Sequence, residues 1–166
     1  MKWMGMGLLL GASLWLARVM ARPYRLRVAA LDDWRQMLGQ LEPLIGWRQM
    51  PLAEAFARAA RTHPGRQRAV ASLVGSLGSR DEDFATAFSR ALAADSALFA
   101  EDREALMALA PVLGKSVAGY QVQHLADVRG DIERILAEAR QYGLKKARLV
   151  ESLVSVAGIA AIILLI

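Results

Sequence analysis

The chain has no cysteine and only two histidines among its 166 residues, and this scarcity excludes several kinds of chemistry. Without cysteine there is no disulfide, no thiol nucleophile and no thiolate-held iron–sulfur cluster. His63 and His124 lie far apart without the companion spacing of a zinc site, so we expect no bound metal. The sequence also lacks a phosphate-binding loop, a nucleophile elbow and a dinucleotide fingerprint. We therefore expect a protein that is not an enzyme and that binds no cofactor or small-molecule substrate.

Signals for β-strands are missing as well. No stretch alternates apolar and polar residues for long, and the helix-favouring residues Ala, Leu, Arg, Glu and Gln are abundant. The sequence predicts an all-α protein with a bundle of about six helices. We expect helices over residues 24–45, from Pro51 to a break at 63–65, over 66–77, 83–93 and 102–113, and from 116 into the C-terminal apolar run. Pro43 and Pro111 fall inside two of these ranges, where a proline bends or ends a helix.

Apolar residues recur at helical spacing in the first and last of these segments, which predicts that both face a common core. The two stripes are Leu31, Trp34, Leu38, Leu41 and Ile45, and Val122, Leu125, Val128, Ile132, Ile135 and Ala139. A third pattern is an internal similarity at an offset of 32 residues, between residues 46–59 and 78–91. It indicates either two equivalent turn–helix units or the ordinary likeness of two alanine-rich helices.

Both ends of the chain are apolar, and the positive charge lies beside them. Residues 3–17 and 152–166 carry no charge, whereas Arg18, Arg22, Arg25 and Arg27 follow the first run and Lys145, Lys146 and Arg148 precede the second. Residues 28–140 hold 13 Arg/Lys and 15 Asp/Glu, so the net charge of +5 does not indicate a nucleic-acid partner. Apolar runs with basic flanks predict membrane anchors at 1–21 and 149–166 around a cytoplasmic domain at 22–148.

The same bias predicts that both termini lie on the side of the membrane opposite the domain. A cleaved signal peptide is the alternative for the first run, although no clean cleavage site follows it. Whether the short second run spans the bilayer fully is left open, because fifteen helical residues rise only about 22 Å. Small residues in the two runs, which would let membrane helices pack closely, are Gly7, Gly11, Ala157, Gly158 and Ala161.

The acidic clusters read as ordinary surface. Asp32 and Asp33 are neighbours on a helix, so their side chains diverge, and we expect a solvated face. Acids at 81–83 and 101–104 suit the starts of helices. His124 borders the second stripe and is expected to be partly packed and hydrogen-bonded.

The order of several short motifs resembles a known family nearly from end to end. They are Leu41-Glu42 with Ile45, residues 51–56, 113–116, Gln121 with 123–125, 136–140, and the closing 152–154 and 165–166. In this order the chain resembles the stage III sporulation protein AB family of endospore-forming bacteria. Val117 and Pro43 depart from the family pattern.

The resemblance implies a non-enzymatic membrane component of the channel-like complex between mother cell and forespore. Its helical domain is similar to the inner-membrane platforms of type II secretion and type IV pilus machines, which implies an assembly ATPase and other membrane subunits as partners. The expected contact is the pair of turns that open the repeated units, with Trp47, Arg48, Arg80, Asp81 and Glu82. A reduced secretion or pilus platform and a membrane-anchored regulator are the alternatives.

Overall fold

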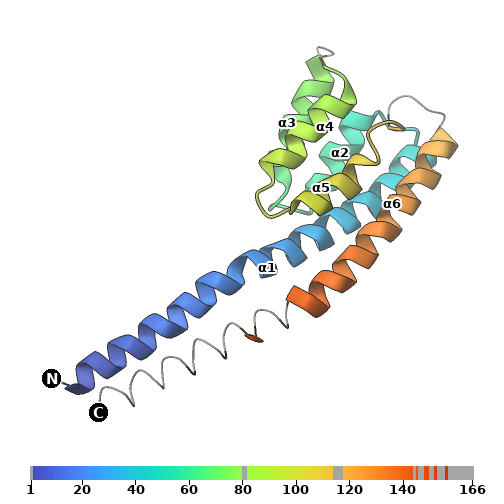
Figure 1. Ribbon diagram of the computed structural model, residues 1–166. Helices are drawn as coiled ribbons and strands as arrows, with labels where there is room; N and C mark the ends of the chain where they lie inside the picture. The colour runs from blue at the N-terminus through green and yellow to red at the C-terminus, as the bar shows by residue number, and fades with distance from the viewer. Residues whose placement is uncertain are drawn as a thin grey trace. The chain divides into compact units, whose positions relative to one another are not determined.

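The computed structural model describes residues 2–79, 82–113 and 118–143, and beyond these the helical positions Lys145, Arg148, Leu149, Ser152 and Val156. The described chain is helical throughout, as the sequence predicted (Figure 1). Its helices are α1 (Lys2–Gly46), α2 (Leu52–Ala60), α3 (Gln67–Ser79), α4 (Phe84–Ala94), α5 (Ala100–Met107) and α6 (Ala118–Glu138), followed by a π-helical turn at Ala139–Gly143.

The chain divides into two compact units. The bundle comprises residues 29–137, and the terminal unit comprises residues 1–28 and 138–166. Helix α1 contributes to both units, because it continues without interruption from Lys2 to Gly46. The separate helix expected to begin near residue 24 was therefore wrong. Pro23 lies inside α1, where it removes one backbone donor, and the helix-favouring residues on both sides outweigh that loss.

Pro43 and Pro111 have different effects: α1 ends at Gly46, close to the predicted end at residue 45, whereas the helix expected to reach residue 113 ends earlier. Helix α1 passes Pro43, whose carbonyl oxygen accepts hydrogen bonds from the backbone N–H groups of Trp47 at 3.1 Å and Arg48 at 3.3 Å. Helix α5 ends at Met107 instead of reaching residue 113. The backbone around Pro111 forms successive turns with bonds between residues three apart, and these turns still bury Leu109 and Leu113 completely.

The predicted stripes form the core of the bundle. All five stripe residues of α1, from Leu31 to Ile45, are buried, and Leu125, Val128 and Ile132 of α6 are buried too. Val122 and Ile135 are only half-buried, while Leu136, which the stripe omitted, is buried. A pitch of 3.6 residues makes the buried face drift across neighbouring positions over several turns, which explains the exchange of Ile135 for Leu136.

An aromatic cluster joins α1, α2 and α4. The rings of Trp34 and Phe88 meet edge to face at 6.1 Å, and Phe84 stacks on Phe88 at 5.2 Å. Phe56 packs against both Phe84 and Phe88, each at 6.2 Å. Because aromatic side chains bury the largest apolar areas, this cluster is the centre of the bundle core.

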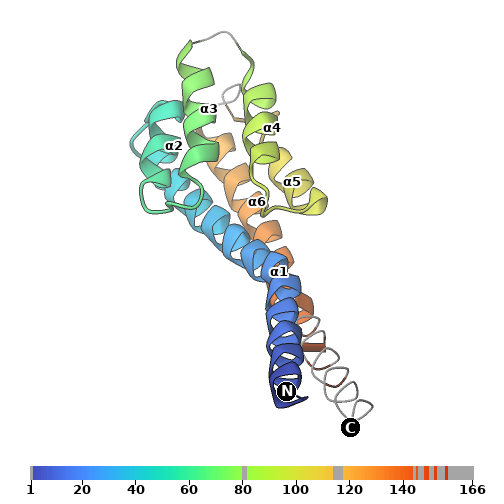
Figure 2. The ribbon, with the colours of Figure 1, turned by 90° about the vertical axis from the view of Figure 1, so that its left-hand side faces the viewer.

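The repeated segments occupy equivalent places in the bundle. Phe56 and Phe88, which are 32 residues apart, touch each other and are fully buried, and Ala55 and Ala59 are buried like their counterparts at 87 and 91. Helix α3 packs on both α2 and α4, as the views from two sides show (Figures 1 and 2). The internal similarity thus corresponds to two turn–helix units with the same buried face.

Within the part of the chain described here, no helix combines the length and the apolarity that a membrane crossing requires. Most of residues 149–166 lies outside the described positions, and so do Ala157, Gly158 and Ala161. Gly7 and Gly11 lie in α1, and no side chain or neighbouring backbone approaches within 4 Å of where a Cβ on Gly11 would be. The two anchors and their small-residue faces therefore stay predictions.

Helix α1 and helix α6 meet most closely at Gly46, which yields a test of this packing. A Cβ at position 46 would lie 2.8 Å from Val122 Cγ2, inside van der Waals contact. We expect Gly46→Ala to lower the free energy of unfolding by about 1–3 kcal/mol, because the two helices must separate. Denaturant unfolding measures this change, and adding Val122→Ala should recover part of it.

Gly130→Ala is the matched control. Gly130 is exposed in the middle of α6, and a Cβ there meets nothing within 4 Å. This change should raise the free energy of unfolding by up to about 1 kcal/mol, because alanine favours helix more than glycine does. Equal effects of the two alanine substitutions would contradict the close approach of α1 and α6.

Candidate functional site

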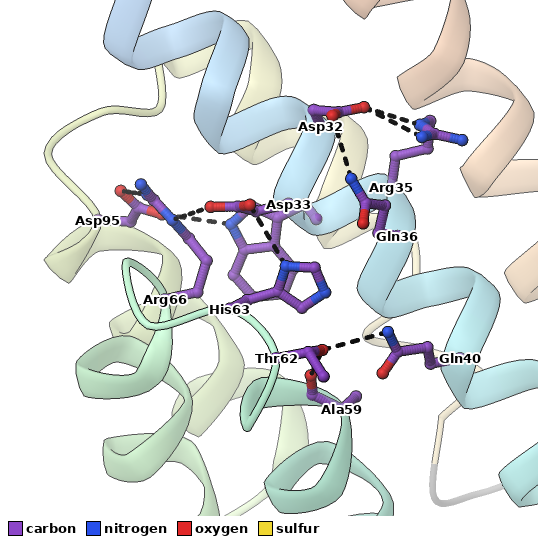
Figure 3. Close-up of polar contacts among 11 residues, drawn as sticks. Asp32, Asp33, Arg35, Gln36, Gln40, Ala59, Thr62, His63, Arg66 and Asp95 are labelled. Carbon is purple, nitrogen blue, oxygen red and sulfur yellow. Dashed lines mark hydrogen bonds and ion pairs between the residues drawn. The ribbon is translucent and has the colours of Figure 1, made fainter.

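A cluster of polar side chains is enclosed in the bundle, against the middle of α1 (Figure 3). Arg66, just before α3, forms an ion pair with Asp95, just after α4. Asp95 Oδ2 also accepts a hydrogen bond of 3.3 Å from the indole Nε1 of Trp34. Asp33 Oδ2 lies 3.3 Å from Arg66 Nε, and Asp33 Oδ1 lies 3.3 Å from Nδ1 of His63. The cluster thus connects α1 with the loops that follow α2 and α4.

The burial of this cluster means that its ion pair and hydrogen bonds affect the stability of the fold. Arg66, Asp95 and His63 are 8%, 7% and 5% exposed, so water reaches none of these three residues freely. A charge taken from water is costly unless an opposite charge and hydrogen bonds replace its hydration. Asp95 meets this need with the Arg66 and Trp34 bonds and with a further one from the backbone N–H of Ala97 at 3.1 Å.

The surface interpretation of Asp32 and Asp33 is half right. Asp32 bonds Arg35 and Gln36 along the outer side of the helix, as a solvated face would. Asp33 instead points to His63 and Arg66, as the close-up shows (Figure 3). Sequence reasoning missed this because the partners of Asp33 lie 30 and 33 residues away. One signal was present, since His63 and Asp95 are themselves 32 residues apart and extend the internal similarity.

The arrangement of His63 suits a structural role. A carboxylate only accepts, so Nδ1 of the imidazole donates the hydrogen bond to Asp33. Nε2 is buried and has no hydrogen-bond partner among the described residues, and a substrate could not reach a ring that is 5% exposed. No group of three or more possible metal ligands occurs in the described ranges. We interpret the cluster as a clamp that holds the bundle together.

The other expected roles of polar residues agree with the structure. Asp102 lies in the first turn of α5 and accepts a hydrogen bond of 2.8 Å from the backbone N–H of Phe99, which caps the helix. His124 is half-buried at the edge of the core, and its Nε2 lies 2.8 Å from the carbonyl oxygen of Ala108. Both residues therefore stabilise local packing.

The turn after α1 has a different character. Trp47 is 90% exposed, the highest value among the exposed large apolar residues of the described chain, and Arg48 beside it is exposed too. Gln49 has a φ of 48°, a left-handed conformation that non-glycine residues rarely adopt. Trp47 therefore does not pack into its own bundle. A tryptophan beside an arginine has the composition that binding hot spots favour.

A second exposed aromatic residue lies at the same end of the bundle. Gly46 approaches Val122, so the end of α1 adjoins the start of α6. Tyr120, two residues before Val122, is 62% exposed and stacks on His124. Sequence reasoning missed Tyr120 because it precedes the apolar stripe. We name Trp47, Arg48 and Tyr120 the turn surface.

A groove lies between the start of α2 and the connection from α3 to α4. It has a volume of about 370 Å³, and its lining comes from the start of α2, the α3–α4 connection and the end of the α5 segment: Pro51, Leu52, Ala53, Leu77, Glu82, Asp83, Phe84 and Leu113. Only two residues separate Arg48 from the groove residue Pro51. The groove is thus lined by residues of the second turn and by the residues that directly follow the first, and a surface shared by both turns stays a prediction.

The charged residues of the second turn differ in their structural surroundings. Glu82 lines the groove, but its carboxylate pairs with Arg90 of the following helix and is therefore already engaged. Asp83 is the N-cap residue of α4. Arg80 and Asp81 lie outside the described residues. Among the described residues that were expected to contact a partner, Trp47 and Arg48 are thus the two with exposed side chains.

The buried ion pair generates a stability prediction. We expect Asp95→Ala to lower the free energy of unfolding by about 3–5 kcal/mol, because the guanidinium of Arg66 stays buried with only Asp33 beside it. Replacing Arg66 by Met in the same protein should recover part of the loss. The exposed carboxylate of Asp131, which pairs with Arg134, is the control, and Asp131→Ala should change stability by less than about 0.5 kcal/mol. Similar losses for the two alanine variants, measured by thermal unfolding, would refute the clamp.

Comparison with known proteins assigns the chain to a family. The family model for stage III sporulation protein AB matches residues 2–166, which include both the bundle and the terminal unit. No curated protein and no solved structure matches it. The family is named for a stage of sporulation and not for an enzymatic activity. The match agrees with the resemblance seen in the short motifs, and the chain belongs to the stage III sporulation protein AB family, a family of sporulation proteins.

Proposed function

We propose that this protein is a non-enzymatic membrane platform in the channel complex that links mother cell and forespore during endospore formation. In this role the bundle docks the assembly ATPase of the complex through the turn surface and the adjoining groove. The observation that carries the proposal is the 90% exposure of Trp47 in the turn that leads to Pro51, which lines a groove of about 370 Å³. An exposed tryptophan with a neighbouring arginine is the composition that binding hot spots favour.

The order of the elements supports docking at this end of the bundle. Helices α2 and α4 each begin beside the groove and end at the buried polar cluster. The cluster holds one end of both helices firmly, so the turns at the other end can present side chains without loss of the core. A platform needs this combination of a rigid body and an exposed contact surface.

The membrane part of the proposal rests on charge and hydropathy. The uncharged runs at 3–17 and 152–166 are flanked by basic residues on the side of the bundle, and such flanks stay in the cytoplasm. Anchors at both ends would hold the bundle to the mother-cell membrane around the forespore, beside other membrane subunits of the complex. A reduced secretion or pilus platform is the second candidate, and the sporulation family of the chain weighs against it.

Docking is tested with single substitutions on the turn surface. We expect Trp47→Ala to weaken binding of the ATPase roughly 30-fold, since a central hot spot contributes about 2 kcal/mol or more. Arg48→Glu should weaken it as well by reversing a charge at the contact. Binding is measured by titrating the purified ATPase against the purified chain, and the unfolding temperature of each variant should match that of the parent protein because both side chains are exposed.

Two exposed residues away from the turn surface serve as controls. Tyr142 is 71% exposed in the terminal unit and Arg68 is exposed in the first turn of α3, so Tyr142→Ala and Arg68→Glu match the two test changes in kind. Neither should alter the affinity. If Trp47→Ala binds the ATPase as tightly as the parent protein, the turn surface is not the docking site.

The topology is tested with cysteines, because the chain has none of its own. Cysteines added at either end should react with an impermeant thiol reagent in intact non-sporulating cells that express the chain. A cysteine at position 68 should react only after the cells are lysed, because the proposed topology places the bundle in the cytoplasm. Labelling of position 68 in intact cells would reverse the proposed orientation.

A further inference from the structure

One face of α1 in the terminal unit carries a groove that the platform role does not use. The groove has a volume of about 310 Å³ and is lined by Trp15, Arg18, Val19, Arg22, Arg25 and Leu26. Steps of three and four residues place all six on one side of the helix. Three of the lining residues carry a guanidinium group and three are apolar, so the groove combines positive charge with a hydrophobic wall.

The first part of the chain carries only positive charge. Residues 1–31 include no Asp or Glu, and the first carboxylate of the chain is Asp32 in the bundle. Arg18 and Arg22 are exposed and lie four residues apart, so one anion can lie between both guanidinium groups. Guanidinium groups bind phosphate oxygens through paired, charge-assisted hydrogen bonds. The ligand that suits the polar part of this groove is therefore a phosphate group.

The apolar wall indicates where that phosphate comes from. Trp15, Val19 and Leu26 are 68%, 44% and 45% exposed, an unusual display for three large apolar residues on one helix face. Tryptophan prefers the boundary between headgroups and acyl chains, where the ring is in contact with lipid and the indole N–H stays near water. Arginine next to it extends its apolar stem along the lipid and keeps its charge at the headgroup.

We propose that this groove binds the headgroup phosphate of an anionic glycerophospholipid, with Arg18 and Arg22 on the phosphate and Trp15 against the upper acyl chain. The inference rests on the proposed membrane role, because it requires α1 to lie at a bilayer. It adds that a particular lipid class is bound at a fixed place on α1. Arg25 has another interaction in the structure and is not needed for the contact.

The test compares two lipids that differ only in their headgroup. The full chain is purified in detergent, and short-chain phosphatidylglycerol or phosphatidylcholine is titrated in while native mass spectrometry counts the bound lipid. We expect clearly tighter binding of phosphatidylglycerol, and the Arg18→Gln/Arg22→Gln double variant should weaken it roughly 10- to 30-fold, because each basic residue near a headgroup contributes roughly three- to fivefold. The Arg18→Lys/Arg22→Lys variant should retain most of the preference, since the charge is kept.

The control removes the same charge elsewhere. Arg58 and Arg68 are exposed on the bundle, and the Arg58→Gln/Arg68→Gln variant should bind phosphatidylglycerol like the parent chain. Inorganic phosphate added in excess should not displace the lipid, because the apolar wall contributes to binding. Equal binding of the two lipids, or equal loss in both glutamine variants, would overturn the lipid site.

Failure of the lipid site and failure of the platform proposal give different results. If cell fractionation finds the unmodified chain outside the membrane fraction, the proposed membrane role is wrong and the lipid site falls with it. If the chain is in the membrane fraction but does not distinguish the two headgroups, only the lipid site is wrong. Trp15→Ala adds an independent readout, since it should weaken lipid binding while leaving ATPase binding unchanged.

Discussion

The buried ion pair between Arg66 and Asp95 is the interaction on which the bundle depends. Each of its charges would be costly in the interior alone, and each becomes tolerable only when the other is in place. The pair forms when the loop before α3 and the loop after α4 come together on α1, where Trp34 completes the bonding of Asp95. The pair therefore stabilises the arrangement of three segments at once, because Arg66, Asp95 and Trp34 come from different parts of the bundle.

Around this pair the two repeated units have the same order of structural features. Each unit starts at an exposed turn, buries a phenylalanine in the middle of its helix, and ends with a buried polar residue that reaches α1. His63 contacts Asp33, and Asp95 contacts the adjacent Trp34. Two units with the same design meet neighbouring positions of one helix. The repetition concentrates the polar bonding at one end of α2 and α4 and leaves the other end open for contacts.

This separation of stability and contact is what the proposed platform role requires of a small domain. The core is supplied by the stripes of α1 and α6 and by the aromatic cluster, and none of those side chains is needed at the surface. The turn surface carries an exposed tryptophan without any cost to this core. In the terminal unit the basic and apolar face of α1 is a separate feature, and it is the face proposed to contact lipid.

Helical class, core stripes and family could be read from the residues because they depend on short-range periodicity and on motifs in order. Leu31, Trp34 and Leu38 are buried as their spacing predicted. Their spacing says nothing about what lies opposite, and the partners that define the candidate sites are 29 to 61 residues apart in the sequence.

Tertiary structure decided the features that depend on such distant partners. It paired Asp33 with His63 and Arg66, left Trp47 exposed, and placed the start of α2 and the connection from α3 to α4 on one groove. It also carried α1 through Pro23, since one lost backbone bond is outweighed by the surrounding helix. The sequence by itself determined which residues prefer helix and which prefer the core, because both are local properties. Which polar residues form contacts, and which aromatic residue stays exposed, depends on how all the helices pack together.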